Sequence, residues 1–299
     1  MRLALITVNY NNAERTIALL ESLKDQLLHD VRVYVVDNAS EPEDKNALEV
    51  FITNAQTPDI SFVASAENNG FSAGNNLAIK QALADGAEWI ALINNDTVVK
   101  PDFVTRLLEE LSKIPPSIAC IPLKEGERVA YTGLVKWFLI TLPHIYSLAG
   151  ARRHSDNIYA IGGGVAFHRS VIDKIGLWDE RYFLYFEDAD FSMRARKAGI
   201  QITPLEGPII EHAGSASTKK LGGPLLLRYH ARNSLLFNST YGNKYVRFLL
   251  PIGIWFGIIK QSIKRVWAKK SKDLPTAESA QAILKGMSDF RHGHWGKLS

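Results

Sequence analysis

Short apolar runs alternate with helical stretches through the first third of this 299-residue chain. The apolar runs are residues 3–8, 31–36, 60–64 and 89–93. Residues 13–28, 42–53, 72–84 and 101–111 carry apolar side chains at the spacing of a helix. This alternation is typical of successive strand-helix-strand units, and it predicts an α/β fold with a parallel sheet.

Polar clusters follow the four predicted strands. They are Asn9-Tyr10-Asn11, Asp37-Asn38, Glu67-Asn68-Asn69-Gly70 and Asn94-Asn95-Asp96. Each cluster alone is compatible with an ordinary turn, because Asn, Asp and Gly are common turn residues. Ligands of an open parallel sheet bind at the carboxyl ends of its strands, so the four clusters together predict a nucleotide site. No P-loop or dinucleotide-binding glycine motif follows the first strand, so we expect another way of holding the nucleotide.

The composition narrows the class of protein. Apolar residues make up 46% of the chain, which suffices for one large domain with an appendage. Cys120 is the only cysteine, so an internal disulfide is excluded and a reducing compartment is expected. The net charge of +4 does not indicate nucleic-acid binding. The apolar run 248–259 contains Pro251, Gly253 and Gly257 and is shorter than the ~20 residues of a spanning helix, so no transmembrane helix is predicted.

Three carboxylates lie close together in the second half of the chain. Glu187, Asp188 and Asp190 follow the aromatic residues of 182–186, at the start of a helical stretch over 189–198. Capping of that helix accounts well for one acid and less well for three. Neighbouring like charges beside aromatic rings raise a carboxyl pKa, which is what a general base needs. The preceding segment 120–159 shows no regular pattern, and Gly162-Gly163-Gly164 fits either a turn or a close backbone approach to a ligand.

Together these motifs resemble the inverting GT-A glycosyltransferases of family 2, especially the bacterial rhamnosyltransferase-like branch. The resemblance covers residues 1–217 through ITVNYNN, VVDNAS, ENNGFSAGNN, LINNDT, GGGVAF, GLWDERYFLYFEDADFSMRARKAG and EHAGSAS. It implies a GT-A domain, a Rossmann-like nucleotide-diphospho-sugar transferase fold, over residues 1–221. Its nucleotide-sugar half would span about residues 1–115 and its acceptor half about residues 116–221. A mainly helical extension would follow over residues 222–299.

The resemblance also implies the residues that bind the donor, a nucleotide-diphosphate sugar. Asp37 would contact the nucleoside, and the loop around Asn69 and Gly70 would close over the nucleotide. The full implied set is Asn9, Asp37, Asn69, Gly70, Gly74, Asn75, Asn95 and Gly163. Turn formation remains the alternative for the Asn and Gly positions.

A divalent metal, Mn²⁺ or Mg²⁺, is implied as cofactor. Family members usually carry a D-x-D-like motif after the fourth strand, whereas this chain has Asn94-Asn95-Asp96 with one carboxylate. Asp96 would hold the metal at the diphosphate, and His212 occupies the family position of a second ligand. A carboxylate and an imidazole suit Mn²⁺ at least as well as Mg²⁺. A structural role is the alternative for His212.

Catalysis is implied for the acidic cluster. Asp188 would deprotonate the acceptor hydroxyl, and Glu187 would orient the acceptor or support Asp188. Asp190 and Arg194 would hold the local structure. Trp178, Asp179 and Glu180 would line the acceptor site.

The segment 222–299 accumulates Lys and Arg residues interleaved with apolar ones and with Trp255 and Trp267. This pattern fits an amphipathic helix on an anionic membrane, or helices that pack on the catalytic domain with a basic outer face. We therefore expect a cytoplasmic protein with peripheral contact to the inner face of the membrane. The expected reaction is hexosyl transfer, with dTDP-rhamnose as leading donor, to a saccharide or polyprenyl-linked acceptor in surface polysaccharide synthesis. A nucleotidyltransferase and a non-catalytic sugar-nucleotide or glycan-binding subunit are the alternatives.

Overall fold

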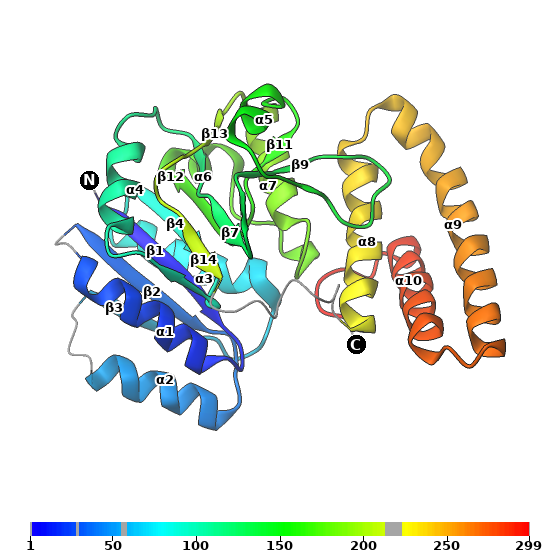
Figure 1. Ribbon diagram of the computed structural model, residues 1–299, viewed down its shortest axis with the longest axis horizontal. Coiled ribbons are helices and arrows are strands. Elements are labelled where there is room, and N and C mark those ends of the chain that lie inside the picture. The colour runs from blue at the N-terminus through cyan, green and yellow to red at the C-terminus, as the bar shows by residue number, and fades with distance from the viewer. Residues whose placement is uncertain (1, 28–29, 55–58, 213–222, 299) are drawn as a thin grey trace.

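A seven-stranded sheet organises the N-terminal two-thirds of the chain in the computed structural model, which describes residues 2–27, 30–54, 59–212 and 223–298 (Figure 1). In spatial order its strands are β13 (Ile202–Pro204), β6 (Ile118–Cys120), β12 (Gly164–His168), β4 (Trp89–Ile93), β1 (Leu3–Asn9), β2 (Val31–Asp37) and β3 (Ile60–Ala64). Strands β1 to β4 are parallel, and β12 is antiparallel to both β4 and β6. The predicted α/β fold with a central parallel sheet is confirmed.

Helices cover both faces of this sheet. Helices α1 (Ala13–Leu23), α2 (Pro42–Asn54) and α4 (Phe103–Leu111) bury one face. Helices α3 (Gly70–Ala84), α6 (Arg169–Ile175) and α7 (Glu187–Lys197) bury the other. Because both faces are covered, the central strands read as continuous apolar runs rather than as alternating ones. A 3₁₀ turn, η1 (Lys24–Gln26), follows α1.

Residues 120–159, which show no sequence pattern, contribute strands to two small sheets and form a short helix. One sheet contains β5 (Thr97–Val99), β14 (Ile210–His212), β7 (Leu123–Glu125) and β8 (Arg128–Ala130). The other contains β10 (His144–Ile145), β9 (Thr132–Leu134) and β11 (Ile158–Tyr159), and α5 (Leu148–Arg153) lies between β10 and β11 in the chain. Strands of two or three residues are too short to produce a periodic pattern.

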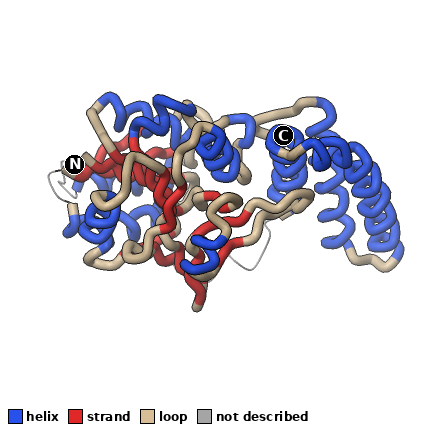
Figure 2. Tube along the Cα trace, turned by 90° about the horizontal axis from the view of Figure 1, so that it is seen from above, coloured by secondary structure: helices blue, strands red, loops and turns tan. Residues whose placement is uncertain are grey.

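The C-terminal region consists of α8 (Pro224–Tyr241), α9 (Lys244–Lys270) and α10 (Leu274–His292). Helix α10 packs between α8 and α9, and α9 is the outermost helix (Figures 1 and 2). The predicted domain boundary at residue 221 falls outside the described residues. Helix α8 shares a buried cluster with residues of the sheet domain, in which Phe237 packs against Phe186.

Helix α9 differs from the expectation that Pro251, Gly253 and Gly257 interrupt the apolar run. It continues for 27 residues through Pro251. Proline has no N–H group, so Pro251 cannot donate the helical hydrogen bond to the carbonyl of Arg247. Both residues are exposed. By length and composition alone, α9 is the one helix among the described residues that could cross a membrane.

Helix α9 presents an exposed apolar face, called here the α9 stripe. Its residues recur at intervals of one to four, they keep to one side of the helix, and each is at least 38% exposed. The stripe comprises Tyr245, Phe248, Leu249, Ile252, Trp255, Phe256, Ile259, Ile263, Val266 and Trp267. The opposite side of α9 packs on the bundle through Val246, Leu250, Gln261 and Ala268. Helix α9 therefore has one side that is buried against the bundle and one apolar side that is exposed.

Candidate active site

The acidic pair Glu187-Asp188 lies at the first turn of α7, after a strained segment of backbone. Phe183, Tyr185 and Phe186 have φ angles of 51°, 72° and 74°. A non-glycine residue adopts this left-handed region at a cost of about 1–3 kcal/mol, so neighbouring structure must hold it. The 3₁₀ turn η2 (Glu180–Tyr182) leads into the segment.

Two side chains of α8 hold this segment in place. The Nδ2 atom of Asn233 donates to the carbonyl oxygens of Tyr182, Leu184 and Tyr185, each at 2.8 Å. The guanidinium of Arg232 donates to the carbonyl of Arg181 at 3.1 Å and, through its other terminal nitrogen, to the carbonyls of residues 294 and 296 at 3.1 and 2.8 Å. Both side chains are fully buried. We call this pair the α8 clamp.

A cavity of about 330 Å³ opens in front of the acidic pair. It brings together residues of the sheet edge, the two small sheets, α7 and α8. Its lining comprises Phe71, Asn94, Leu123, Glu125, Thr141, Leu142, His144, Tyr159, Ile161, Gly162, Gly163, Leu184, Tyr185, Phe186, Glu187, Asp188 and His230. Three of the predicted site residues, Gly163, Glu187 and Asp188, thus share one cavity.

The two carboxyl groups of the pair differ in their hydrogen bonds. Asp188 accepts from the backbone N–H of Gly162 at 3.0 Å through Oδ2 and from that of Ala189 at 2.7 Å through Oδ1. Oε2 of Glu187 is buried without a hydrogen-bond partner among the described residues. Burial, then the charge of Asp188, raises the pKa of Glu187 well above its usual value. Burial also raises the pKa of Asp188, although the two backbone donors and the charge of His144 oppose the increase. Glu187 therefore keeps its proton more readily, and Asp188 is the member of the pair that ionises.

Asp190 has the structural partners expected of it. Its carboxylate forms an ion pair with Arg194 at 2.8 Å and accepts a hydrogen bond from the hydroxyl of Tyr241 at 2.5 Å. Tyr241 is the last residue of α8. The contact therefore joins α7 to the C-terminal region a second time.

The strand ends form one hydrogen-bonded network. Asn9 donates to Asp37 at 3.2 Å and to Asp44 at 2.8 Å, and it accepts from Thr16 at 2.8 Å. Asn95 donates to Thr16 at 3.0 Å. Asn9 and Asp37 are fully buried. The amide of Asn9 thus aligns the ends of β1 and β2 and the carboxylate of Asp37.

The predicted nucleotide loop forms the N-terminal end of α3. Gly70 has a φ of 90°, and a Cβ atom there would lie 2.3 Å from the carbonyl oxygen of Phe183, so a side chain has no room. Gly74 packs against β1, where a Cβ atom would lie 3.0 Å from Val8. Asn75 is buried and donates to the carbonyl of Phe71 within the helix, whereas Asn69 is exposed. The loop thus contacts the strained segment before the acidic pair.

The residues predicted for a metal lie on adjacent strands. Asp96 immediately precedes β5, and His212 of β14 pairs with Thr97 of β5, the residue after Asp96. The side chain of His212, and all of residues 213–217 of the EHAGSAS motif, lie outside the described part of the structure. Among the side chains that are described, no cluster of three or more His, Cys, Asp or Glu could hold a metal. A carboxylate with one imidazole still fits a metal that takes its remaining ligands from phosphate and water.

Gly163 approaches the residue that begins this motif. A Cβ atom at Gly163 would lie 2.4 Å from the Asn94 side chain, so a larger residue there would displace that side chain. Asn94 lines the cavity together with Asp188. The end of β4 is thereby placed beside the acidic pair.

The predicted acceptor residues are held by contacts with residues other than the acidic pair. Trp178 is 2% exposed, and its ring packs on Phe191 and Phe71 with centroid distances of 5.0 and 6.0 Å. Asp179 forms an ion pair with Arg181, and Glu180 accepts from Asn76 at 2.8 Å. None of Trp178, Asp179 and Glu180 is among the described residues that line the cavity, and their role as acceptor contacts stays a prediction.

Sequence reasoning missed several residues of the site. Glu125 and His144 line the cavity and are joined by an ion pair at 2.9 Å. His230 of α8 lines it as well and stacks on Tyr185 with a centroid distance of 3.8 Å. These residues lie in segment 120–159, which shows no regular sequence pattern, or in the C-terminal region, where no site was predicted. The presence of histidine was the only feature of the sequence there that could have indicated a site.

Comparison with known families adds a family assignment to this geometry. Residues 4–176 match the family model described as glycosyl transferase family 2. The chain is 26% identical over 269 residues to the low-salt glycan biosynthesis hexosyltransferase Agl10 of Haloferax volcanii, covering 85% of this chain and 82% of that protein. It is 23% identical over 239 residues to the dTDP-rhamnosyl transferase RfbF of Shigella flexneri, covering 77% and 78%.

Solved structures share the fold. The mannosyltransferase PcManGT of Pyrobaculum calidifontis, in complex with GDP-Man and Mn²⁺, superposes with a TM-score of 0.60 at 13% identity, over 97% of this chain and 87% of that one. A TarS fragment of S. aureus in complex with UDP-GlcNAc gives a TM-score of 0.55 at 15% identity, over 98% and 92%. At these identities the likeness concerns the fold alone.

Proposed function

Since the chain belongs to glycosyl transferase family 2, we propose that it transfers a hexose from a nucleotide-diphosphate sugar to a saccharide or polyprenyl-linked saccharide, with inversion. The observation that carries this proposal is the position of Asp188 in a cavity that also contains Asn94 and Gly163, next to the strand ends. The family favours glycosyl transfer over nucleotidyl transfer and over a silent binding subunit.

Asp188 acts as the base in this proposal. Its carboxylate takes the proton of an acceptor hydroxyl while that oxygen forms a bond to the anomeric carbon. The bond between the anomeric carbon and the diphosphate breaks on the opposite face, and the nucleoside diphosphate leaves with the electron pair. No covalent intermediate with the protein is needed, so the configuration inverts.

Glu187 supports this step by remaining protonated. Its raised pKa leaves a single negative charge on the pair, located on Asp188. Two adjacent ionised carboxylates would repel each other in a cavity with little water. The N–H groups of Gly162 and Ala189 orient the Asp188 carboxylate.

Asp96 and His212 would hold a divalent metal at the diphosphate. When bound, Mn²⁺ or Mg²⁺ would neutralise charge that develops on the leaving nucleoside diphosphate. PcManGT, which shares the fold, is described in complex with Mn²⁺. Asn9, Asp37, Asn69, Gly70, Gly74, Asn75 and Asn95 are proposed to form or support the nucleotide site.

Rhamnose is the proposed donor sugar, because RfbF is described as a dTDP-rhamnosyl transferase. Agl10 is described as a glycan-biosynthesis hexosyltransferase, which supports a saccharide acceptor in surface polysaccharide synthesis. A thermal-shift panel of dTDP-rhamnose, UDP-galactose, GDP-mannose and UDP-GlcNAc, each with Mn²⁺ and with Mg²⁺, tests the donor. A ligand that binds only the folded state raises the melting temperature, and a shift with another donor in place of dTDP-rhamnose would contradict rhamnose.

Peripheral contact with the cytoplasmic face of the membrane completes the proposal. The α9 stripe would enter the interface between headgroups and acyl chains. Arg247, Lys260, Lys264 and Lys269 flank the stripe and would face anionic headgroups. An interfacial position fits better than a spanning one, because one side of α9 packs on α10.

The substitution Asp188→Asn tests the mechanism. Transfer is expected to fall to background while donor binding, measured by thermal shift, persists. Asp190→Asn is the matched control, because it removes a neighbouring carboxylate that is bonded to Arg194 and lies outside the cavity lining. The control should lose stability and retain measurable transfer. Normal turnover by Asp188→Asn would exclude Asp188 as the base.

A further inference from the structure

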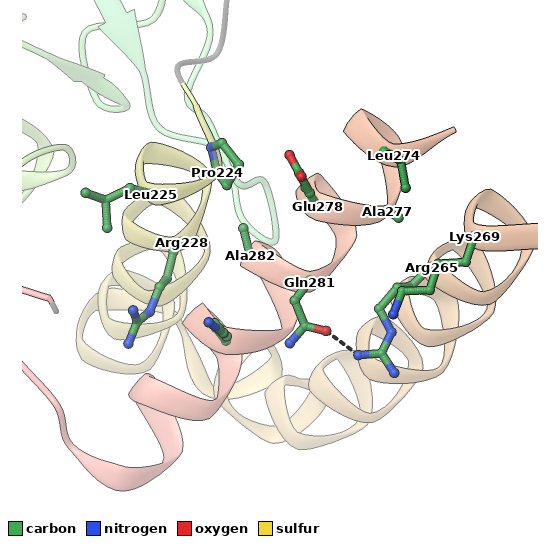
Figure 3. Close-up of a pocket in the computed structure, with 11 residues that line it drawn as sticks. Pro224, Leu225, Arg228, Arg265, Lys269, Leu274, Ala277, Glu278, Gln281 and Ala282 are labelled. Atoms are coloured by element: carbon green, nitrogen blue, oxygen red, sulfur yellow. Dashed lines mark hydrogen bonds between the residues drawn. The ribbon is translucent and has the colours of Figure 1, made fainter. Parts of the chain in front are cut away.

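A second hollow, separate from the catalytic cavity, lies among the three C-terminal helices (Figure 3). It has a volume of about 570 Å³ and shares no lining residue with the catalytic cavity. Its lining comprises Pro224, Leu225, Arg228, Arg265, Lys269, Leu274, Ala277, Glu278, Gln281, Ala282 and Lys285. We call it the bundle groove.

The bundle groove carries uncompensated positive charge. Arg265, Lys269 and Lys285 form no ion pair with any described residue, and the partner of Arg265 is the neutral side chain of Gln281 (Figure 3). Arg228 is different, because Asp289 neutralises it through hydrogen bonds of 2.6 and 3.0 Å. Glu278 is the one acid among the lining residues. An anionic ligand would therefore be attracted into the groove.

The same groove has apolar walls. Leu225 and Leu274 line it and are 50% and 62% exposed, although large aliphatic side chains gain free energy when they leave water. Ala277 and Ala282 are buried in its floor. A small inorganic anion would leave the leucines exposed, whereas an anionic amphiphile covers them and meets the cations as well.

The α9 stripe reaches the edge of the groove. Val266 and Trp267 end the stripe, and they lie between Arg265 and Lys269 in the sequence of the same helix. A bilayer that contacts the stripe would therefore bring its headgroups to the groove. The length of α9 thus joins an apolar contact surface to a cationic hollow.

We propose that the bundle groove binds one anionic phospholipid of the bilayer. Arg265, Lys269 and Lys285 hold the phosphate, while Leu225 and Leu274 contact the first acyl carbons. The proposal deepens the membrane contact of the proposed function and rests on it for the source of the lipid. Glycosyl transfer itself does not depend on it.

A water-soluble lipid tests the groove without a membrane. Isothermal titration of the full chain with dihexanoyl phosphatidylglycerol, kept below its micelle concentration, is expected to show saturable binding of one lipid. Dihexanoyl phosphatidylcholine and inorganic phosphate are expected to bind at least tenfold more weakly. Equal binding of inorganic phosphate would identify a free-phosphate site, and equal binding of phosphatidylcholine would remove the charge argument. Either result, or no binding of the anionic lipid, would overturn the proposal.

Two charge-matched variants locate the site. Lys269→Gln with Lys285→Gln removes two exposed cations of the groove, and the anionic lipid should then bind at least tenfold more weakly. Lys260→Gln with Lys264→Gln removes two exposed cations of α9 that do not line the groove, and binding should be unchanged. Equal losses in both variants would mean non-specific attraction and overturn the proposal. Melting temperatures equal to that of the parent chain check the fold.

Vesicle sedimentation separates this proposal from the membrane contact. Phe248→Ser with Trp255→Ser, at positions 75% and 58% exposed, should weaken binding to phosphatidylglycerol vesicles and leave binding of the monomeric lipid intact. Absence of vesicle binding by the parent chain would overturn the membrane contact. If the parent chain binds vesicles but the Lys269 and Lys285 substitutions do not weaken binding of the monomeric lipid, the lipid site in the bundle groove is overturned and the membrane contact is not.

Discussion

Substitution of Asn233 by alanine should weaken the hold of the α8 clamp on the backbone segment before the acidic pair. The change removes one buried amide that donates to three carbonyl oxygens at 2.8 Å. An amide group has two hydrogens, so these contacts amount to about two full hydrogen bonds, each with a net value of about 1 kcal/mol. The Asn233 side-chain oxygen also accepts from Nε of Arg232 at 2.8 Å, so we expect a loss of at least about 2 kcal/mol in the free energy of unfolding. With an unfolding entropy of ~2.1 cal/mol/K per residue over 299 residues, the melting temperature should fall by at least about 3 °C.

The effect on catalysis should be larger than the effect on stability. Phe183, Tyr185 and Phe186 have left-handed backbone next to Glu187 and Asp188, and without the Asn233 amide this segment can relax. A displacement of the base by ~1 Å costs on the order of 100-fold in rate. The value of kcat should therefore fall about 100-fold, while the KM for the donor changes little.

The assay is acceptor-dependent release of nucleoside diphosphate, together with a thermal melt. Asn238→Ala is the matched control, because Asn238 is a buried asparagine of the same helix that bonds to Ser234 and Phe138 instead of the segment 182–185. It should lower the melting temperature by a similar amount with a much smaller loss of kcat. A fully active Asn233→Ala protein would refute the positioning role of the clamp.

Three further results are expected. The rate should decrease as the pH falls through the raised pKa of Asp188, because only the ionised carboxylate accepts a proton. The substitution His144→Gln should move this decrease in rate to higher pH, because the charge of His144 opposes the increase of the Asp188 pKa. A profile of kcat against pH that is unchanged in His144→Gln would contradict this electrostatic role. Gly70→Ala should lower the free energy of unfolding by more than about 2 kcal/mol, because its Cβ atom would lie 2.3 Å from the carbonyl oxygen of Phe183, and denaturant titration measures the loss. Asp96→Ala and chelation of divalent metal should each weaken donor binding in a titration with the nucleotide sugar, and donor affinity insensitive to both would argue against a metal at Asp96.

Strand ends and helices of the sheet domain could be predicted from the sequence because their patterns are local. β3 and β4 have the predicted bounds of 60–64 and 89–93, and the predicted helix over 42–53 corresponds to α2, Pro42–Asn54. A buried parallel sheet produces long apolar runs, and its ligand edge follows from the strand direction. Gly163, Glu187 and Asp188 follow none of the four predicted strands, and their assignment to the site came from the resemblance to family 2.

Other parts of the site depend on contacts between residues far apart in the chain. Asn233 meets Tyr185 across 48 residues, and nothing in the sequence around Asn233 distinguishes it from an ordinary helical asparagine. Glu125 and His144 lie on strands of two or three residues, which carry no periodic signal. Trp178, predicted at the acceptor, is placed in the core by its aromatic neighbours, since sequence does not reveal which face of a loop is buried.

The guanidinium of Arg232 joins the turn before the acidic pair to residues 294 and 296, so three distant stretches of chain meet at one buried cation. Burial lowers the pKa of Arg232 to about 10, and its charge therefore persists at neutral pH and requires all of these carbonyls. The catalytic half and the helical half consequently cannot be exchanged between relatives as independent modules. A chimera joined on either side of α8 would separate Arg232 from some of its carbonyl partners, so the turn before the acidic pair, α8 and residues 294–296 would have to come from the same relative.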